Sequence, residues 1–260
     1  MRQTATPRGA SRSSVCVGGA LVGPGGTRFK EFRLPTVAFV SPKGGAGKTT
    51  AALLLALGLA ERGLRVAIID SDPNKPMVHW AGLPGRPDLI TVHAAPTEFD
   101  IRDALREAQR KQPDWLILDT EGSIRGAMAF RSLHPNLILT PLAASQLEAL
   151  QAIKATEIVG QFGRHGAQAP LHRALLTRVP AALRPRSLKQ VVEQLRANHM
   201  EMLPTALIEK EAFRALFAIG GGFDALAEEG ISGVPAARAN AQLYLEAVME
   251  LLRKAEAPAA

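Results

Sequence analysis

Residues 41–50 read Ser-Pro-Lys-Gly-Gly-Ala-Gly-Lys-Thr-Thr and lie between a β-branched, apolar segment at 36–40 and an apolar helical segment that begins at Thr49. Closely spaced glycines allow the backbone to turn its N–H groups toward phosphate oxygens, and the N-terminus of the following helix adds positive partial charge. In such a loop Lys48 contacts the β- and γ-phosphates, and the Thr49 hydroxyl binds Mg²⁺. These residues therefore predict a nucleoside-triphosphate site in an α/β protein.

Outward from this loop, short apolar runs alternate with helical segments along the chain. The runs are continuously apolar instead of alternating, which is typical of parallel strands covered on both faces. The segment at 202–207 is a further candidate strand, and Pro141 is expected to end the strand before it. The expected strands are 36–40, 64–70, 89–93, 115–119, 136–140 and 173–177, and the expected helices are 49–62, 99–111, 145–162, 187–198 and 236–255.

Composition limits the classes of protein that the chain can represent. The 260 residues contain one cysteine, Cys16, which excludes a disulfide scaffold and any site built on several thiolates. The net charge is +7, but residues 1–33 contribute six basic residues and one acid, so the rest is close to neutral. No transmembrane span or secretion signal is visible. We expect a mobile basic tail at 1–33 and a single domain at 34–257 in a cytoplasmic protein.

Two further strands end in carboxylates. Asp70 is the last residue of the run at 64–70 and Asp72 follows it, while Asp119 comes directly after Leu116-Ile117-Leu118. Because parallel strands present their carboxyl ends at one edge of the sheet, these acids are expected beside the phosphate loop. A carboxylate in this place holds Mg²⁺, usually through water, because Mg²⁺ loses its hydration shell reluctantly.

The loop resembles the deviant Walker A sequence of the ParA/MinD superfamily of ATPases. The strict phosphate-loop pattern requires glycine at position 42, where this chain has Pro42, and Lys43 is the extra lysine of the deviant form. The resemblance implies a P-loop NTPase fold with a mostly parallel, twisted sheet of about seven or eight strands and helices on both faces. It also implies that residues 44–50 bind ATP and that Lys43 reaches the nucleotide of a second subunit.

The acidic segments also match this family, with one departure. Ile69-Asp70-Ser71-Asp72-Pro73-Asn74 resembles the family segment D-x-D-P-Q, which implies that Asp72 lies near the γ-phosphate and orients water, and that Asp70 lies nearer the metal or braces the loop. Many members read D-x-P-P where this chain has Asp119-Thr120-Glu121-Gly122. That form is similar to the ATPase that assists conjugative or T-DNA transfer, and Gly122 is a candidate N–H donor to the γ-phosphate.

The resemblance thus assigns catalytic roles to Lys43, Lys48 and Asp72, and a Mg²⁺ site to Thr49, Asp72 and Asp119. The resemblance implies adenine contacts from Thr177, Arg178 and the segment 204–213, in which Ile208 and Glu209 face the base. Family members bind nonspecific DNA through basic residues, for which the segment 171–200 offers candidates. They are Arg184, Arg186, Lys189 and Arg196, although Glu193 interrupts the row and a solvated helix face is the competing interpretation.

The expected function is that of an ATP-dependent homodimer that binds nonspecific DNA and hydrolyses ATP slowly until a ParB-like or other partner stimulates it. Such a protein acts in plasmid or chromosome partition or in cargo positioning, and associates with the nucleoid when ATP-bound. One alternative is a MinD-like membrane-cycling ATPase, but the last helix contains Glu246, Glu250 and Glu256, so no stable membrane association is expected. The other is an ATP-dependent biosynthetic ligase on the same fold.

Overall fold

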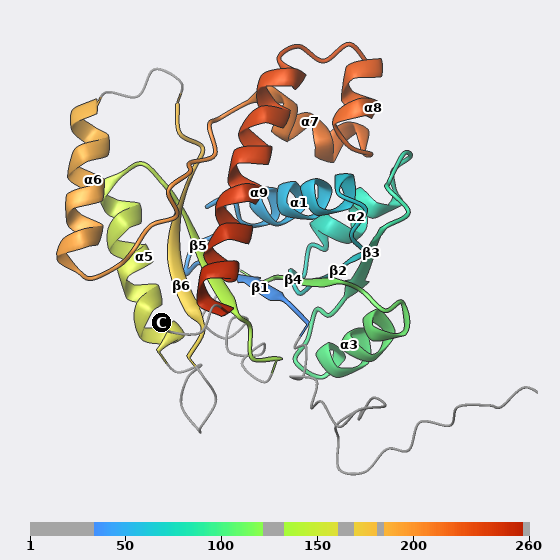
Figure 1. Cartoon of the computed structure of the whole chain (residues 1–260), viewed down its shortest axis with the longest axis horizontal. Helices are drawn as coiled ribbons and strands as arrows, with labels where there is room; N and C mark the ends of the chain where they lie inside the picture. Colours follow the sequence, from blue (N-terminus) through green and yellow to red (C-terminus); the bar gives the residue numbers. More distant parts are fainter. Residues whose placement is uncertain (1–33, 122–132, 161–168, 181–184, 257–260) are drawn as a thin grey trace, which may run out of the picture. The chain divides into compact units, whose positions relative to one another are not determined.

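A computed structural model of the chain describes residues 34–121, 133–160, 169–180 and 185–256. A six-stranded sheet lies at its centre, and every pairing between neighbouring strands is parallel, in the order β3-β2-β4-β1-β5-β6 (Figure 1). The α/β fold predicted from the sequence is therefore confirmed. The strands are β1 (Thr36–Phe39), β2 (Val66–Asp70), β3 (Ile90–Ala94), β4 (Trp115–Asp119), β5 (Leu137–Ala143) and β6 (Leu171–Thr177).

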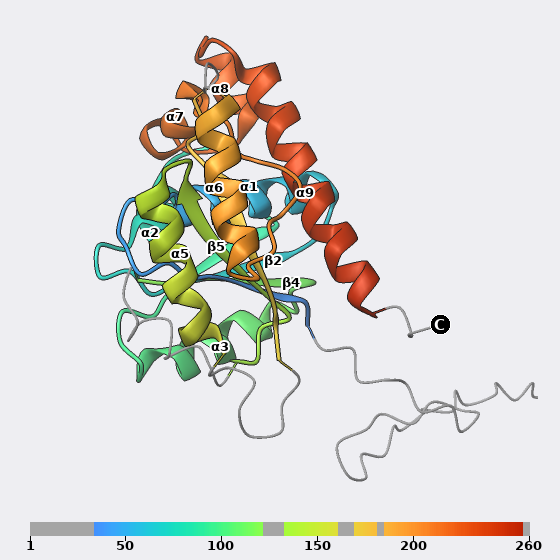
Figure 2. The same cartoon turned by 90° about the vertical axis from the view of Figure 1, so that its left-hand side faces the viewer.

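Helices cover both faces of this sheet. Figures 1 and 2 show α1, α7 and α8 on one face and α3 on the other, while α5 packs on the β5–β6 part of the sheet and α6 packs on α5. No described helix is long and apolar enough to span a bilayer. The helices are α1 (Lys48–Glu61), α2 (Pro76–Gly82), α3 (Asp100–Arg110), α5 (Gln146–Val159), α6 (Pro185–Ala197), α7 (Glu211–Ile219), α8 (Phe223–Glu228) and α9 (Val234–Glu256).

Helix α1 is apolar on nearly all sides because it is enclosed. Residues 51–60 of this helix are all buried, between the sheet and α9. Gly58 allows the close approach of α9, since a Cβ at this position would lie 2.9 Å from Leu245 Cδ2. The buried helix predicted after the phosphate loop is confirmed, and its enclosure holds the N-terminus of α1 in a fixed place.

The sheet has fewer strands than predicted. Six strands pair in the described part of the chain, against an expectation of about seven or eight. The candidate strand at 202–207 forms an isolated bridge between Met202 and Ala174, and its backbone then continues alongside β6 through hydrogen bonds from Leu203 and Leu207. In a regular parallel ladder the donor after Leu203 would be residue 205, whereas the Leu176 carbonyl accepts from Leu207. The segment therefore loses the regular alternation of a strand after Leu203.

Pro141 does not end β5, which continues to Ala143, so that expectation was wrong. The Leu139 carbonyl accepts a hydrogen bond from Val40 N, so the backbone of Leu139 faces β1. Residue 141 faces the same side, because the direction alternates along a strand. However, β1 ends at Phe39, so the absent N–H of Pro141 costs no ladder hydrogen bond.

The other boundaries agree to within a few residues, whereas three short helices were not anticipated. Helices α2, α7 and α8 have seven, nine and six residues, too few for a clear helical period in the sequence. They nevertheless bury Trp80, Phe213 and Phe223 in the main core. The predicted tail at 1–33 lies outside the described residues.

Candidate nucleotide-binding site

The register of the sheet brings the loop and the acids to one edge. Phe39, Asp70 and Asp119 are the last residues of β1, β2 and β4, and Asp119 is in register with both of the others. The segments that follow these three strands therefore leave the sheet at the same level. This is the arrangement that the sequence predicted for the phosphate loop and the two acidic strand ends.

The phosphate loop has the backbone geometry that its glycines permit. Gly45 and Gly47 have φ angles of +80° and +87°, and Gly47 caps α1, with its carbonyl accepting the N–H of Ala51 at 2.9 Å. A Cβ on Gly47 would lie 3.2 Å from Thr177 Oγ1. The loop therefore opens directly into the N-terminus of α1, where free N–H groups attract anions.

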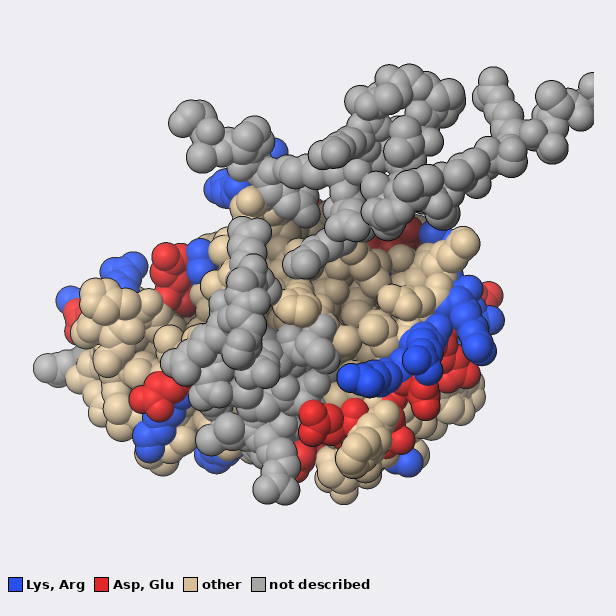
Figure 3. All heavy atoms as spheres, turned by 90° about the horizontal axis from the view of Figure 1, so that it is seen from below, with Lys and Arg blue, Asp and Glu red and all other residues tan. Residues whose placement is uncertain are grey.

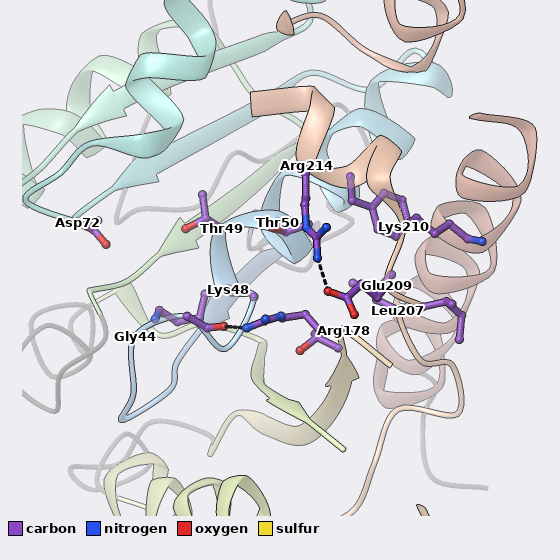
Figure 4. A pocket seen from close by; sticks show the side chains of 15 residues that line it. Gly44, Lys48, Thr49, Thr50, Asp72, Arg178, Leu207, Glu209, Lys210 and Arg214 are labelled. Carbon is purple, nitrogen blue, oxygen red and sulfur yellow. Dashed lines mark hydrogen bonds and ion pairs between the residues drawn. The ribbon is translucent and has the colours of Figure 1, made fainter. Parts of the chain in front are cut away.

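A cavity of about 340 Å³ lies over this loop (Figure 4). One end carries the loop glycines, Lys48 and Asp72, and the other is closed by the segment that follows 206. Of the predicted site residues, the cavity gathers the phosphate-binding and the base-side groups. Its lining is Gly44, Gly45, Gly47, Lys48, Thr49, Thr50, Asp72, Thr177, Arg178, Leu207, Ile208, Glu209, Lys210, Phe213 and Arg214.

Lys48 is a buried cation in this cavity. Lys48 is 6% exposed, and this burial lowers the pKa of its ammonium. The negative charges of Asp119, Asp72 and Glu121 act in the opposite direction and raise that pKa. A buried ammonium is poorly solvated, so it gains when an anion approaches. The position and surroundings of Lys48 suit a lysine that binds a phosphate group.

Asp119 lies beneath the loop as a fully buried carboxyl group. Neither of its oxygens has a hydrogen-bond partner among the described residues. Burial, and next the carboxylate of Asp70, raise the pKa of Asp119 to about 7, although the Thr49 hydroxyl and Lys48 act in the opposite direction. A buried carboxylate of this kind is costly unless a cation balances it.

These residues fit a bound Mg²⁺. Asp119, at the end of β4, and the Thr49 hydroxyl, in the first turn of α1, supply oxygen ligands, and Asp72 and Thr49 line the cavity. No group of three or more acidic, histidine or cysteine side chains that could hold a metal occurs in the described part of the chain. Mg²⁺ suits such a site, because it binds one or two carboxylates together with phosphate oxygens and water.

Asp70 braces the neighbouring segment. Its carboxylate accepts hydrogen bonds from the backbone N–H groups of Asp72, Met77 and Val78, at 3.1, 2.9 and 3.2 Å. Two of these donors lie in the first turn of α2, so Asp70 accepts backbone N–H groups that have no partner within that helix. Asp70 therefore braces the segment that carries Asp72, while its place relative to a bound metal ion stays a prediction.

Asp72 is held beside the cavity by the next residues along the chain. Its Oδ1 accepts the backbone N–H of Asn74 at 2.8 Å and the Asn74 side-chain amide at 3.1 Å. Figure 4 shows Asp72 at the same end of the cavity as Thr49. Asn74 therefore limits the orientations that the Asp72 carboxylate can take.

The base side of the cavity is built from β6 and residues 207–214. Arg178 has a φ angle of +50°, and its guanidinium donates to the Gly45 carbonyl at 3.0 Å. Leu207, Ile208 and Phe213 supply apolar wall, and Glu209 forms an ion pair with Arg214 (Figure 4). This wall offers apolar surface and backbone groups of the kind that bind a planar base.

The chain matches a family of known proteins over most of its length. The CobQ/CobB/MinD/ParA nucleotide-binding domain matches residues 37–218. The chain belongs to this family. It is 28% identical to Protein ParA of Rhizobium radiobacter over 223 residues, which are 85% of this chain and 99% of that protein. It is also 28% identical to VirC1 of the same organism over 182 residues, 68% of this chain and 78% of VirC1.

A solved structure extends the likeness to the fold. The ATP complex of the D38A variant of Cyanothece McdA covers 84% of this chain and 97% of its own, with a TM-score of 0.61 and 18% identity. The P-loop NTPase fold and the ParA-like branch inferred from residues 43–49 and the acidic strand ends are thus confirmed. The family is one of nucleotide-binding ATPases.

Three of the described residues predicted for the site, Lys43, Ala46 and Asp119, do not line the cavity, and the role of Lys43 across a dimer stays a prediction. Lys43 is exposed and does not line the cavity; its ammonium lies 3.2 Å from Glu148 Oε1. Ala46 is buried and its carbonyl accepts the Thr177 hydroxyl, so it contributes loop backbone only. Gly122 lies outside the described residues.

The predicted DNA residues are only partly described. Lys189 is exposed and lies 3.8 Å from Glu193, and Arg196 is exposed in the last turn of α6. Arg184 and the side chain of Arg186 are outside the described part. On the face seen from below, basic and acidic side chains lie side by side where the picture shows them (Figure 3). The predicted basic patch on α6 therefore stays a prediction.

Sequence reasoning missed part of the base-side wall. Leu207, Lys210, Phe213 and Arg214 line the cavity, and Asn240 of α9 fixes this wall by accepting the Ile208 N–H and donating to the Ala206 carbonyl, both at 2.8 Å. Leu207, Lys210 and Phe213 lie in the segment 204–213 that the resemblance placed beside the adenine, whereas Arg214 and Asn240 lie outside every predicted site segment. No local signal marks Asn240, because α9 also carries Arg238, Gln242 and Glu246 around it.

Proposed function

We propose that this protein is a Mg²⁺-dependent ATPase that dimerises when it binds ATP and uses hydrolysis to position DNA or another cellular cargo. The observation that carries the proposal is the cavity over residues 44–50, in which Lys48 faces the phosphate-binding loop above the unpaired carboxylate of Asp119. These groups suit a triphosphate and its metal ion better than any other ligand class.

The chain's own residues account for most of what phosphoryl transfer to water requires. The loop N–H groups and Lys48 bind and orient the phosphates, and Thr49 and Asp119 hold Mg²⁺, which neutralises developing charge when bound. Asp72 orients the attacking water from the edge of the cavity, where Asn74 holds its carboxylate. Positioning and charge neutralisation supply most of the catalysis in this reaction class.

The ATP-dependent switch is inferred from Lys43 and from the relatives. Lys43 is exposed beside the loop and lies outside its own cavity, so its side chain is accessible to the cavity of a second subunit. When the γ-phosphate leaves, this trans contact is lost and the dimer separates. The likeness to Protein ParA and to a protein named for the maintenance of carboxysome distribution supports a role in positioning.

DNA binding is the finer part of the proposal. A dimer brings two copies of the exposed cations of α6 together. Each DNA phosphate that these cations neutralise releases bound counterions, so the protein binds DNA without recognising its base sequence. A ParB-like or other partner then raises the slow hydrolysis rate and sets the time spent on DNA. Cytoplasmic and nucleoid-associated pools follow from this cycle.

The deciding experiment is a mobility-shift assay on nonspecific duplex DNA with ATP, with ADP and without nucleotide, across a salt series. Binding only with ATP, with a steep loss of affinity as salt rises, supports the proposal. Equal binding in all three states contradicts a nucleotide switch. Co-sedimentation with anionic liposomes in the same three states tests the membrane-cycling alternative, and ATP-dependent binding to liposomes but not DNA favours it.

A further inference from the structure

Glu148, in the first turn of α5, makes two contacts that link Lys43 to the sheet. Its Oε2 accepts the backbone N–H of Ala143, the last residue of β5, at 2.7 Å. Its Oε1 lies 3.2 Å from the Lys43 ammonium. The Glu148 side chain is 17% exposed and the Lys43 side chain 54% exposed, so the carboxylate is the fixed member of the pair.

This ion pair determines where the Lys43 ammonium points. Lys43 is directly followed by Gly44, which lines the cavity, yet Lys43 itself does not line it. Its flexible side chain instead reaches Glu148 on α5 of the same subunit, which is 105 residues away in the sequence. An ammonium held on Glu148 must leave that carboxylate before it can extend to a phosphate group of a second copy.

We propose that Glu148 is a positioning residue that retains Lys43 within its own subunit and releases it when two copies meet across ATP. The inference rests on the ATP-dependent dimer proposed above. A γ-phosphate with its several anionic oxygens outcompetes a single carboxylate for the ammonium. Glu148 thus opposes dimer formation, and the opposition is overcome when a terminal phosphate is present.

The size of the effect follows from the exposure of the pair. A partly exposed ion pair changes an equilibrium constant by roughly two- to fivefold. Each dimer breaks two such pairs, so removing the charge of Glu148 is expected to tighten the dimer by about 4- to 25-fold. The effect is large enough to measure and small enough for the pair to be displaced.

Glu148→Gln is the matched variant, because its side-chain oxygen still accepts the Ala143 N–H while the negative charge is lost. Glu157→Gln is its control, since Glu157 is exposed on the same helix and has no ion pair with any described residue. Both variants make the same chemical change on α5, nine positions apart. Only the first removes the partner of Lys43.

The ion pair is tested without any variant by zero-length carbodiimide cross-linking, which joins a carboxylate to an amine only in direct contact. Trypsin yields residues 34–48, in which Lys43 is the sole internal lysine, and residues 132–154, in which Glu148 is the sole carboxylate. Mass spectrometry therefore assigns this cross-link without ambiguity. We expect it in protein without nucleotide, and less of it with Mg²⁺ and a non-hydrolysable ATP analogue.

Dimer formation is measured by sedimentation velocity with the same analogue. The inference predicts a dimer dissociation constant about 4- to 25-fold lower for Glu148→Gln than for the wild type, and no change for Glu157→Gln. Absence of the cross-link overturns it, as does a Glu148→Gln dimer no tighter than that of the control. A normal wild-type dimer in either case leaves the proposed function standing.

The failure of the proposed function has a different result. A wild-type protein that stays monomeric at saturating analogue contradicts the ATP-dependent dimer. A cross-link that then persists at an unchanged yield also overturns the release of Lys43, while showing that the ion pair itself forms. The two hypotheses are therefore separated by the cross-link and the sedimentation data together.

Discussion

The hydroxyl of Thr177, at the end of β6, lies 2.7 Å from the carbonyl oxygen of Ala46 in the phosphate loop after β1. The same hydroxyl lies 3.2 Å from the Leu142 carbonyl at the end of β5, so it joins three neighbouring segments of the sheet edge. All of these atoms are buried. The phosphate loop is thus held from the base side of the cavity as well as by its own glycines.

The first prediction concerns this contact. Thr177→Val keeps the shape of the side chain but leaves the buried Ala46 carbonyl without its donor, which costs about 1–2 kcal/mol. We expect ATP affinity to fall roughly five- to tenfold by isothermal titration calorimetry. Thr156→Val, at an exposed position of α5, is the control and should bind ATP as the wild type does. Unchanged affinity of Thr177→Val would show that the glycines alone shape the loop.

The second prediction uses the pKa of Asp119, which burial raises to about 7. A raised pKa means that the folded protein keeps a proton on Asp119 that the unfolded chain, whose aspartate pKa is the ordinary 3.8, releases. The free energy of unfolding that depends on Asp119 is therefore highest below about pH 4 and is lost as pH rises toward 7. Asp119→Asn removes this loss and should stabilise the protein without nucleotide by about 2–4 kcal/mol at pH 8.

The same variant should bind nucleotide less well. Because Mg²⁺ requires the ionised carboxylate, Asp119→Asn is expected to weaken Mg²⁺-ATP binding at least tenfold while having little effect on ATP without the metal. Urea unfolding between pH 5.5 and pH 8 measures stability, and titration with and without Mg²⁺ measures binding. A variant less stable than the wild type at pH 8 would mean that Asp119 has a partner in the folded protein.

The third prediction separates the two lysines of the loop. Lys48→Ala should abolish ATP binding or hydrolysis, since it removes the buried cation of the cavity. Lys43→Ala should bind ATP in the monomer as the wild type does but fail to dimerise, because Lys43 lies outside its own cavity. Equilibrium nucleotide binding and size-exclusion chromatography with ATP measure the two effects. If Lys43→Ala dimerised normally, a role across the dimer would be excluded.

The fourth prediction concerns the support of the site by α9. Gly58→Val places methyl groups on α1 where a Cβ alone would lie 2.9 Å from Leu245, so the two helices must separate. We expect a loss of about 1–3 kcal/mol in the free energy of unfolding. Gly82→Val, where a Cβ would meet nothing within 4 Å, is the control in urea denaturation. Equal stabilities would mean that α9 adapts without cost.

Much of the site was predictable because its residues are close together in the sequence. Glycines at 44, 45 and 47 with Lys48 and Thr49 form a complete phosphate loop within six positions, and a buried apolar run ending in Asp119 is readable on its own. The strand count and the continuation of β5 through Pro141 were not predictable, because they depend on which neighbouring strand faces each backbone group.

The order of strands and helices, the phosphate loop and the carboxylates at the strand ends follow from the sequence alone, since local spacing and apolar periodicity determine them. The pairing of Lys43 with Glu148, the unpaired oxygens of Asp119 and the wall at 207–214 are properties of the folded chain. Contacts between groups 100 or more residues apart depend on how the elements pack, and packing leaves no local pattern in the sequence.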